Sequence, residues 1–396
     1  MAIAWCLEYA GLRLADIEHV AVNQLSSAHL VRKGTYVLTH PGAHKLILGR
    51  IRNRQRRQGV QHLLEQAFPG ETFKGARHAI EHHRAHLVSA FYVSPFREAA
   101  VVSVDGFGDF ASAAWGMGSS GGVTIDDRVF FPHSLGIFYE ALTQFLGFPH
   151  YGDEYKVMGL APYGRTRFLN QMRRLVRLAP DGKFSLDLAY FNHQSGVSYQ
   201  WENNAPVVGE LFTPALEELL GPRRVPGDTL TERHHDIAHS VQAMYEEAFF
   251  HLLSRVRDLH PVPNIALAGG CAMNSVANGK IRRRTPYKRT YVQSAAGDAG
   301  GAIGAAFAVW HDQGGARRFV MDHAFWGPDF SQDDIARLLD ASRAQIDDAG
   351  CSVRHVADET KLCKRTAEAI AAGKVVGWFQ GRMEWGPRAL GNRSIV

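Results

Sequence analysis

The chain has 396 residues and a formal net charge of +5, and 45% of its residues are hydrophobic. This length predicts two lobes or domains rather than one compact core. No run of about 18 or more apolar residues occurs and the four cysteines are widely spaced, so the sequence predicts a cytoplasmic protein with no membrane span.

Positive charge is concentrated in two runs, residues 50–57 and 282–284. Runs of this kind bind nucleic acid or phosphorylated ligands in some proteins, and in others they form a solvated helix face or a basic loop. Neither run contains an aromatic side chain on which a base could stack. The sequence therefore predicts no nucleic-acid partner.

In chain order, residues 1 to about 75 show helical patterns, and residues 77–93 predict another helix. Ala99–Val104 predicts a buried strand that stops at Asp105, and two alternating strands follow up to residue 131. A meander of three strands with an acid at the tip of the first is typical of an RNase H-like lobe. Actin-like ATPases and sugar kinases contain two such lobes around a nucleotide cleft, so the pattern predicts an α/β fold of this class by analogy.

The second half of the chain alternates between helices, strands and glycine turns after a polar, loop-rich stretch at 180–230. The predicted elements are a long amphipathic helix at 231–260, a strand at 265–268, a glycine turn at 297–301, helices at 302–310 and 359–372, and a strand at 374–379. A domain boundary is predicted between residues 314 and 345, around further glycines and a proline.

His82 and His86 stand four residues apart in a predicted helix, so both imidazoles project from one face. Two such histidines with carboxylates from elsewhere form a site for a divalent metal, and iron, zinc and manganese are all suitable. Asp105 at a strand end and Asp298 between glycines are candidate carboxylates. A pair alone would be an ordinary surface helix, but with the two acids the sequence predicts a catalytic metal site.

A second histidine pair, His235 and His239, has the same spacing. Its helix continues with apolar residues, and no acid at a strand end follows nearby. We therefore interpret this pair as part of an ordinary helix.

Glycine turns and one loop provide candidate nucleotide-binding residues. At Gly269 and Gly270 the backbone can approach a ligand, and the following helix offers N–H groups to an anion, although a plain strand–helix turn is the alternative. Asn274 can hydrogen-bond a ribose or a base. In the loop that follows residue 153, Glu154 and Lys156 either orient phosphates or substrate or pair with each other on the surface.

Residues 378–394 contain Arg382, Arg388 and Arg393 among glycines and aromatic residues. Guanidinium groups bind phosphate and carboxylate bidentately, so this stretch predicts an anion clamp. A surface loop with solvated arginines is the alternative, and the neighbouring aromatic residues favour a rigid functional loop.

Together these segments resemble the NodU/CmcH carbamoyltransferase family. The matching phrases occur in family order: Glu81–His86, Ser94–Phe96, Ser103–Gly106, Ser134–Gly136, Glu154–Gly164, Leu267–Lys280, Gly297–Ala306 and Trp378–Ile395. The resemblance implies a TsaD-like larger domain over residues 1–325, with a two-lobed actin-like ATPase (ASKHA) fold. It implies that residues 345–396 begin a smaller, YrdC-like α/β domain.

In this family, ATP and carbamoyl phosphate give carbamoyl-adenylate at the smaller domain, and the carbamoyl group then passes to a hydroxyl or amine of a small-molecule acceptor at the larger domain. The resemblance implies that the four predicted ligands hold a divalent metal, usually Fe²⁺, with Zn²⁺ or Mn²⁺ as alternatives. It places the nucleotide, with Mg²⁺, at Gly269–Asn274 and the adenylate at Arg388 and Arg393. The implied acceptor is a natural product or nodulation factor, and the resemblance leaves room for a homodimer.

The chain also departs from the family pattern. Family members begin with a strand and a phosphate loop that bears His and Asp, whereas this chain starts in the helix that follows and stops soon after the YrdC-like domain begins. We therefore expect an inactive fragment of a carbamoyltransferase. The alternatives are a TsaD-like tRNA threonylcarbamoyl transferase, which would have no YrdC-like extension, a sugar kinase, and a non-catalytic remnant that binds metal and nucleotide.

Overall fold

The computed structural model describes residues 2–40, 59–195, 199–202, 205–317 and 319–396. The basic run at 50–57 lies outside the described residues. The chain divides into two compact units, Met1–Val320 and Met321–Val396. Among the helices that the structure describes, none has the length and apolarity needed to cross a membrane.

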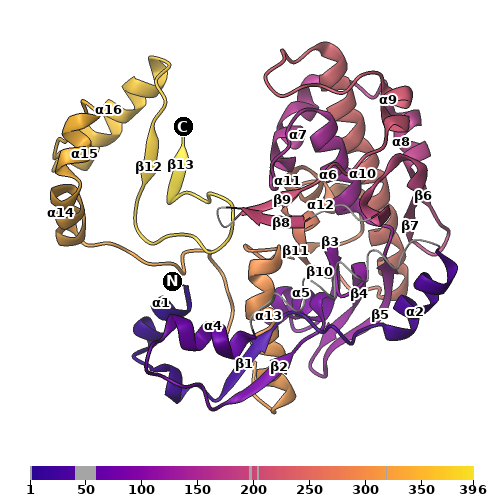
Figure 1. Cartoon of the computed structure of the whole chain (residues 1–396), viewed down its shortest axis with the longest axis horizontal. Coiled ribbons are helices and arrows are strands. Elements are labelled where there is room, and N and C mark those ends of the chain that lie inside the picture. Colours follow the sequence, from indigo (N-terminus) through magenta and orange to yellow (C-terminus); the bar gives the residue numbers. More distant parts are fainter. Residues whose placement is uncertain (1, 41–58, 196–198, 203–204, 318) are drawn as a thin grey trace. The chain divides into compact units, whose positions relative to one another are not determined.

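A mixed five-stranded sheet forms the centre of the first unit (Figure 1). Its strands are β3 (Ala99–Gly108), β4 (Ala111–Ser119), β5 (Gly122–Phe130), β10 (Asn264–Ala268) and β11 (Arg289–Val292). The spatial order is β11-β10-β3-β4-β5, in which β3, β4 and β5 form an antiparallel meander and β10 and β11 continue from β3 as parallel strands. The predicted meander and the predicted strand at 265–268 are confirmed, but β3 does not stop at Asp105 as predicted and continues to Gly108.

Both faces of this sheet are covered by helices. They are α5 (His82–Phe91), α6 (Leu135–Phe145), α10 (Glu232–Leu259) and α13 (Asp298–Asp312). Successive side chains of a strand point to opposite faces, so Ala100 and Val102 of β3 lie in one core with α6 and α10. Ala99 and Val101 lie in the other core with α5 and α13. The helices that begin at His82 and Asp298 therefore share one face of the sheet.

A second, two-stranded sheet pairs β1 (His19–Val22) with β2 (Ala76–Ala79) in parallel. The helices of this region are α1 (Ala2–Ala10), α2 (Leu30–Thr39) and α4 (Val60–Ala67). The prediction of helical structure throughout residues 1–75 was therefore wrong at β1, and the helix predicted from residue 77 begins only at His82. Four-residue strands are too short to show an alternating pattern, and their stability depends on a partner far away in the sequence.

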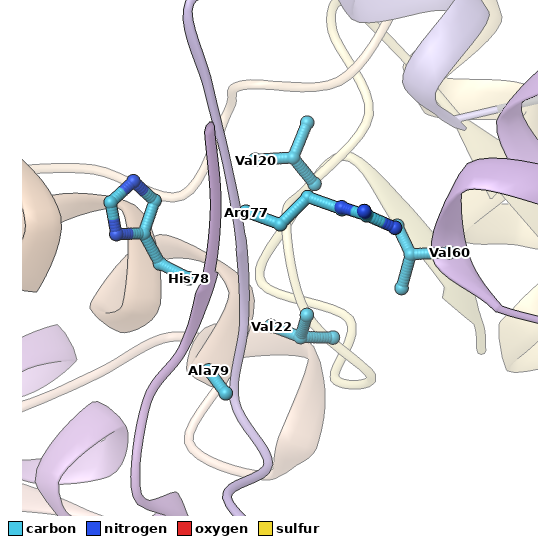
Figure 2. A pocket seen from close by; sticks show the side chains of 6 residues that line it. All are labelled: Val20, Val22, Val60, Arg77, His78 and Ala79. Carbon is cyan, nitrogen blue, oxygen red and sulfur yellow. The ribbon is translucent and has the colours of Figure 1, made fainter. Parts of the chain in front are cut away.

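One face of the small sheet lines a cavity of about 270 Å³ (Figure 2). Val20 and Val22 of β1 share this face with Arg77 and Ala79 of β2 because the register pairs them directly. Val60 of α4 lines the cavity as well. None of the residues predicted to bind metal or nucleotide lines this cavity, so the candidate site lies elsewhere.

The long helix predicted at 231–260 is confirmed as α10, whose apolar face is buried in the core. The remaining described elements of the first unit are short: α7 (Glu154–Leu160), α8 (Leu169–Leu175), β6 (Val176–Leu178), β7 (Phe184–Leu186), β8 (Tyr199–Glu202), β9 (Ala205–Val208), α9 (Pro214–Leu220), α11 (Ser275–Asn278) and α12 (Ile281–Arg284). Short strands and helices within 180–230 agree with the loop-rich pattern of that stretch.

Arg317 fixes the C-terminal end of α5. Its guanidinium donates hydrogen bonds to the main-chain carbonyl oxygens of Phe91, Tyr92, Ser94 and Phe96. Carbonyl groups at the end of a helix have no partner within the helix, so a multivalent donor is well suited to this place. The helix that carries the predicted histidines is thereby anchored at its far end.

The second unit contains three helices and one antiparallel pair of strands. They are α14 (Gln332–Ala341), α15 (Arg343–Asp348), α16 (Glu359–Ala371), β12 (Gly377–Phe379) and β13 (Arg393–Ile395). The helix predicted at 359–372 is confirmed, and the strand predicted at 374–379 is shorter than expected. The buried carboxylate of Glu384 accepts the main-chain N–H groups of Leu390, Asn392 and Arg393, and so holds the loop before β13 in place.

Candidate metal centre

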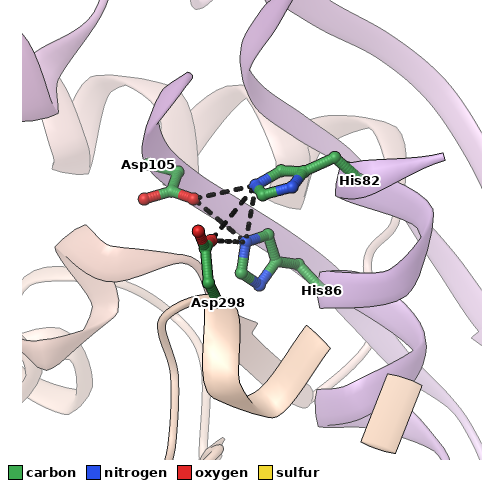
Figure 3. Close-up of side chains that lie close together, drawn as sticks. All are labelled: His82, His86, Asp105 and Asp298. Carbon is green, nitrogen blue, oxygen red and sulfur yellow. Dashed lines mark hydrogen bonds and ion pairs between the residues drawn. The ribbon is translucent and has the colours of Figure 1, made fainter. Parts of the chain in front are cut away.

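The two predicted histidines come together with the two predicted aspartates (Figure 3). His82 is the first residue of α5 and His86 lies one turn further on. Asp105 lies towards the end of β3, and Asp298 is the first residue of α13. One ligand atom from each of the four residues lies within 4.8 Å of the others, so three elements from distant parts of the sequence meet here.

The distances between these atoms suit a single metal ion. Nε2 of His82 and Nε2 of His86 lie 3.0 Å apart, and Oδ2 of Asp105 lies 3.1 and 3.0 Å from them. Oδ1 of Asp298 lies 3.5 and 3.6 Å from the same two nitrogens. Ligand atoms about 2.1 Å from an ion at tetrahedral angles are about 3.4 Å apart. Two imidazoles and two carboxylates are also a donor set that iron, zinc and manganese accept.

The four side chains of the cluster differ in their exposure to solvent. The His86 side chain is 0% exposed and that of His82 is 8% exposed. The Asp105 side chain is 15% exposed, whereas that of Asp298 is 71% exposed. The two histidines are therefore buried, Asp105 is partly buried, and the cluster is open to solvent on the side of Asp298.

Asp105 joins the histidine pair to the glycine turn that follows β10. Its Oδ2 faces both imidazoles, and its Oδ1 accepts the main-chain N–H groups of Gly106 at 2.8 Å and Gly270 at 3.0 Å. Gly269 has a φ of +86°, and a Cβ at this position would overlap the main chain of Val104. Only glycine lets the turn come this close, so the predicted metal and nucleotide segments meet at Asp105.

The N-terminus of α5 is capped by Glu81, to which the sequence patterns assigned no separate role. Its carboxylate accepts the main-chain N–H groups of His83 at 3.2 Å and Arg84 at 2.8 Å, and it pairs with Arg128 at 3.3 Å. Burial alone would raise the pKa of Glu81, but these charges and N–H bonds hold it below its ordinary value. Glutamate is not among the common N-cap residues, so the sequence carried no signal for this contact.

His83, which lies between the two ligands in the sequence, ties α5 to the sheet. Its Nδ1 lies 2.6 Å from the hydroxyl of Ser103 in β3. Burial, together with the nearby charge of His82 and His86, lowers the pKa of His83 to about 3. This imidazole is therefore neutral at physiological pH and has a structural role.

The two aspartates change the ionisation of His86. Burial alone would lower the pKa of His86, but hydrogen bonds to Asp105 and Asp298 and their negative charges raise it to about 9. Burial would likewise raise the pKa of Asp105, and its bonds to His82 and His86 hold it well below the usual range. At neutral pH the cluster therefore holds a proton on His86, which a bound cation would have to displace.

The other candidate ligand-binding residues of the first unit bond to protein groups. The Asn274 side chain caps α11 and exchanges two hydrogen bonds with Gln242, at 2.9 and 3.1 Å. Glu154 is the first residue of α7. Lys156, for which the sequence left a pairing with Glu154 open, forms an ion pair of 2.7 Å with Asp153.

The three arginines of the predicted anion clamp lie in the second unit, where Nε of Arg382 donates to the carbonyl oxygen of Gly327 at 2.9 Å. Nε of Arg393 is 3.3 Å from Oε2 of Glu384, and its guanidinium donates to the carbonyl oxygen of Gly386 at 2.6 Å. Arg388 is half-buried in the same loop. The loop is thus fixed by contacts of its own around Glu384.

The second histidine pair lies on α10, as the sequence predicted. Nδ1 of His239 is 2.8 Å from the carbonyl oxygen of Ala161. Among the described residues, only the cluster of His82 and His86 brings three or more metal-binding side chains together, and His235 and His239 are not part of it.

Two models of the same protein family match this chain, one over its larger N-terminal part and one at its C-terminal end. The family model described as Carbamoyltransferase N-terminus matches residues 1–307, which include all four residues of the cluster. The model described as Carbamoyltransferase C-terminus matches residues 367–396, which include Arg388 and Arg393.

Individual relatives agree with this result. An uncharacterized protein of Synechocystis is 41% identical over 322 residues, 80% of this chain and 50% of that protein. Nodulation protein NolNO of Sinorhizobium fredii is 33% identical over 407 residues, 100% of this chain and 53% of that protein. A 3'-hydroxymethylcephem-O-carbamoyltransferase of Streptomyces clavuligerus is 29% identical over 161 residues, 39% of this chain and 27% of that enzyme.

The chain spans about half the length of the first two of these relatives. A crystal structure of HypF from T. kodakarensis aligns with 64% of this chain and 39% of its own at 17% identity. Its TM-score of 0.31 is too low to support an argument about the fold.

Two neighbouring glycines allow a matched test of the cluster. A Cβ at Gly108 would overlap the imidazole ring of His82, whereas a Cβ at Gly106 would meet open space. We expect Gly108→Ala to displace His82 and weaken Co²⁺ binding by about 10-fold or more, and Gly106→Ala to leave it unchanged. Isothermal titration of both variants measures this, and equal affinities would contradict the assignment of His82 as a ligand.

The protonation of His86 predicts a pH dependence of metal binding. Because its pKa is raised to about 9, protons compete with a cation at every pH below that value. Co²⁺ affinity should therefore rise with pH up to about 9, and binding at pH 7.5 should release close to one proton. Titration in buffers of different ionisation enthalpy counts the released protons. Affinity that is independent of pH over this range would show that His86 is not a ligand.

Proposed function

Because the chain belongs to the carbamoyltransferase family, we propose that it serves the ATP-dependent transfer of a carbamoyl group to a small-molecule acceptor. The group would come from carbamoyl phosphate by way of carbamoyl-adenylate and pass to a hydroxyl or amine. The relative named as a cephem O-carbamoyltransferase supports a small acceptor rather than a nucleic acid.

The metal-ligand cluster is the observation that carries this proposal. Side chains from α5, β3 and α13 converge at distances that suit one ion, and both histidines are buried. A divalent cation held there, with Fe²⁺ as first choice and Zn²⁺ or Mn²⁺ as alternatives, would supply Lewis-acid chemistry towards phosphate and carbamoyl oxygens. Strongly shifted pKa values at His86 and Asp105 are typical of functional sites.

Residues of this chain would have three further roles in the reaction. The two buried histidines and the partly buried Asp105 provide a wall of fixed geometry, which favours the precise orientation of reacting groups. The exposed carboxylate of Asp298 leaves one side of the cluster open to substrate. The N–H of Gly270 is donated to Asp105, so a nucleotide that approached the backbone of this glycine turn, with Mg²⁺, would lie next to the cluster.

The sheet supports an RNase H-like lobe of the actin-like ATPase class. Three antiparallel strands are followed in space by two parallel ones, in the order β5-β4-β3-β10-β11. In open sheets with parallel strands, ligands bind beyond the carboxyl ends of the strands. Asp105 lies towards that end of β3 and Gly269 directly follows β10, so the proposed site has this position.

We propose that residues 345–396, within the second unit, belong to a YrdC-like adenylate-forming domain. The match of the family's C-terminal model to residues 367–396 supports this. Arg388 and Arg393 are its candidate phosphate-binding groups, because guanidinium binds phosphate bidentately. The contacts around Glu384 would hold their loop rigid before a ligand arrives.

The sequence predicts that this chain is inactive in the complete reaction, so the test uses synthetic carbamoyl-adenylate and examines the transfer step alone, for which the protein need not form the adenylate. With water as the acceptor of the carbamoyl group in place of the natural hydroxyl or amine, the metal-loaded protein should release AMP from it faster than the spontaneous rate. His82→Ala/His86→Ala should lower the enzymatic rate by about 100-fold or more, because it removes both buried imidazoles. AMP release is measured by chromatography.

The double variant His235→Ala/His239→Ala is the matched control, because it removes a histidine pair of the same spacing on α10. Its rate should equal that of the unaltered protein. If the metal-loaded protein released no AMP above the spontaneous rate, or if both double variants behaved alike, the proposed transfer function would be contradicted.

A further inference from the structure

The turn between β3 and β4 carries a carboxylate that serves the metal cluster without belonging to it. Oδ2 of Asp109 accepts the main-chain N–H of His82 at 3.0 Å. The same oxygen accepts the main-chain N–H of Leu25 at 2.7 Å. One atom thus joins the first residue of the ligand helix α5 to the loop that follows β1.

The backbone of this turn is held in an unfavourable conformation. Asp109 and Phe110 have φ values of +48° and +78°, and a positive φ is uncommon for residues other than glycine and unusual for a bulky aromatic residue. Phe110 is only 8% exposed and packs against Phe131 and Tyr36, with ring centroids 5.4 and 5.8 Å away. The packing of Phe110 therefore imposes the conformation that directs Asp109 towards α5.

The same turn also contacts the imidazole of His82. Gly108 lies directly against this ring, where a Cβ would overlap it. The turn therefore fixes the main chain of His82 through Asp109 and restricts its side chain through Gly108. A ligand that is held at both places has little freedom to leave the cluster.

The loop bound by Asp109 is tied to a second ligand of the cluster. Nδ2 of Asn23 donates to the main-chain carbonyl oxygen of Asp298 at 3.4 Å. The next residues of this loop, Gln24–Ser27, line a cavity of about 400 Å³ together with Leu30 and Ala79. The wall of the cavity is thus connected to His82 through Asp109 and to Asp298 through Asn23.

We propose that Asp109 is a positioning residue that sets His82 in the metal site and links it to the loop that lines this cavity. This inference rests on the proposed metal site. Asp109 itself is not one of the four clustered ligands, so it acts through the main chain of His82. Removal of a group that hydrogen-bonds the side chain of a metal ligand commonly changes metal affinity about 10- to 100-fold, and we expect the same range for a carboxylate that holds the main chain of the ligand.

Co²⁺ is a suitable probe because its visible absorption depends on the number and geometry of its ligands. Asp109→Ala should weaken Co²⁺ binding by about 10- to 100-fold and change the absorption bands, since His82 is no longer held. Asp109→Asn keeps an uncharged acceptor oxygen and should recover most of the affinity, with a loss of about 3-fold.

Asp187→Ala is the matched control. The carboxylate of Asp187 also accepts a main-chain N–H, that of Ala189, but contacts none of the four ligands. Its removal should leave both the Co²⁺ affinity and the bands unchanged.

Unaltered affinity and bands in folded Asp109→Ala would overturn the inference. If Asp109→Ala does not fold, Asp109→Asn provides the test. In that case the inference would be overturned if Asp109→Asn had the same Co²⁺ affinity and the same absorption bands as the unaltered protein. Failure of the unaltered protein to bind Co²⁺ would instead contradict the proposed metal site, so the two failures are distinguishable.

Discussion

The carboxylate of Asp105 connects the two halves of the candidate site through its two oxygens. Oδ2 faces the imidazoles of α5, while Oδ1 accepts the N–H of Gly270 in the turn after β10. Neither segment can move away from β3 without breaking one of these bonds. Burial of a negative charge is unfavourable unless it is compensated, and the proton retained by His86 provides that compensation. A bound cation would take over the same electrostatic role. The Asp105 carboxylate would then both hold the fold of the first unit together and bind the metal.

The helix that presents the histidines is fixed at both ends. Glu81 and Asp109 accept main-chain N–H groups of its first turn, and Arg317 binds the carbonyl groups of its last turn. Such contacts hold the imidazoles in place before any metal ion binds. This preorganisation favours strong and selective metal binding. Asp298, on a different helix and largely exposed, is the member of the cluster nearest to solvent. A rigid wall with one open side suits an ion that must bind both protein and substrate.

Local patterns were sufficient to predict much of the fold and of the site. The spacing of His82 and His86 predicted a shared helix face, a continuous apolar run predicted the strand that carries Asp105, and alternation predicted the strands that complete the meander. Other features depend on contacts between distant segments and left no local signal. The strand at 19–22 is stabilised by pairing with residues 76–79, and the conformation of Asp109 is imposed by the packing of its neighbour. The same holds for Glu81, whose role as a cap follows from the fold rather than from its preference for that position.

The most direct test of this account is a crystal structure of the protein grown with Fe²⁺ under anaerobic conditions, with diffraction recorded at the iron edge. The account predicts one anomalous peak bounded by Nε2 of His82, Nε2 of His86, Oδ2 of Asp105 and Oδ1 of Asp298, each about 2.0–2.3 Å from the ion. Four intact side chains with no peak between them, or an ion bound only elsewhere, would contradict it.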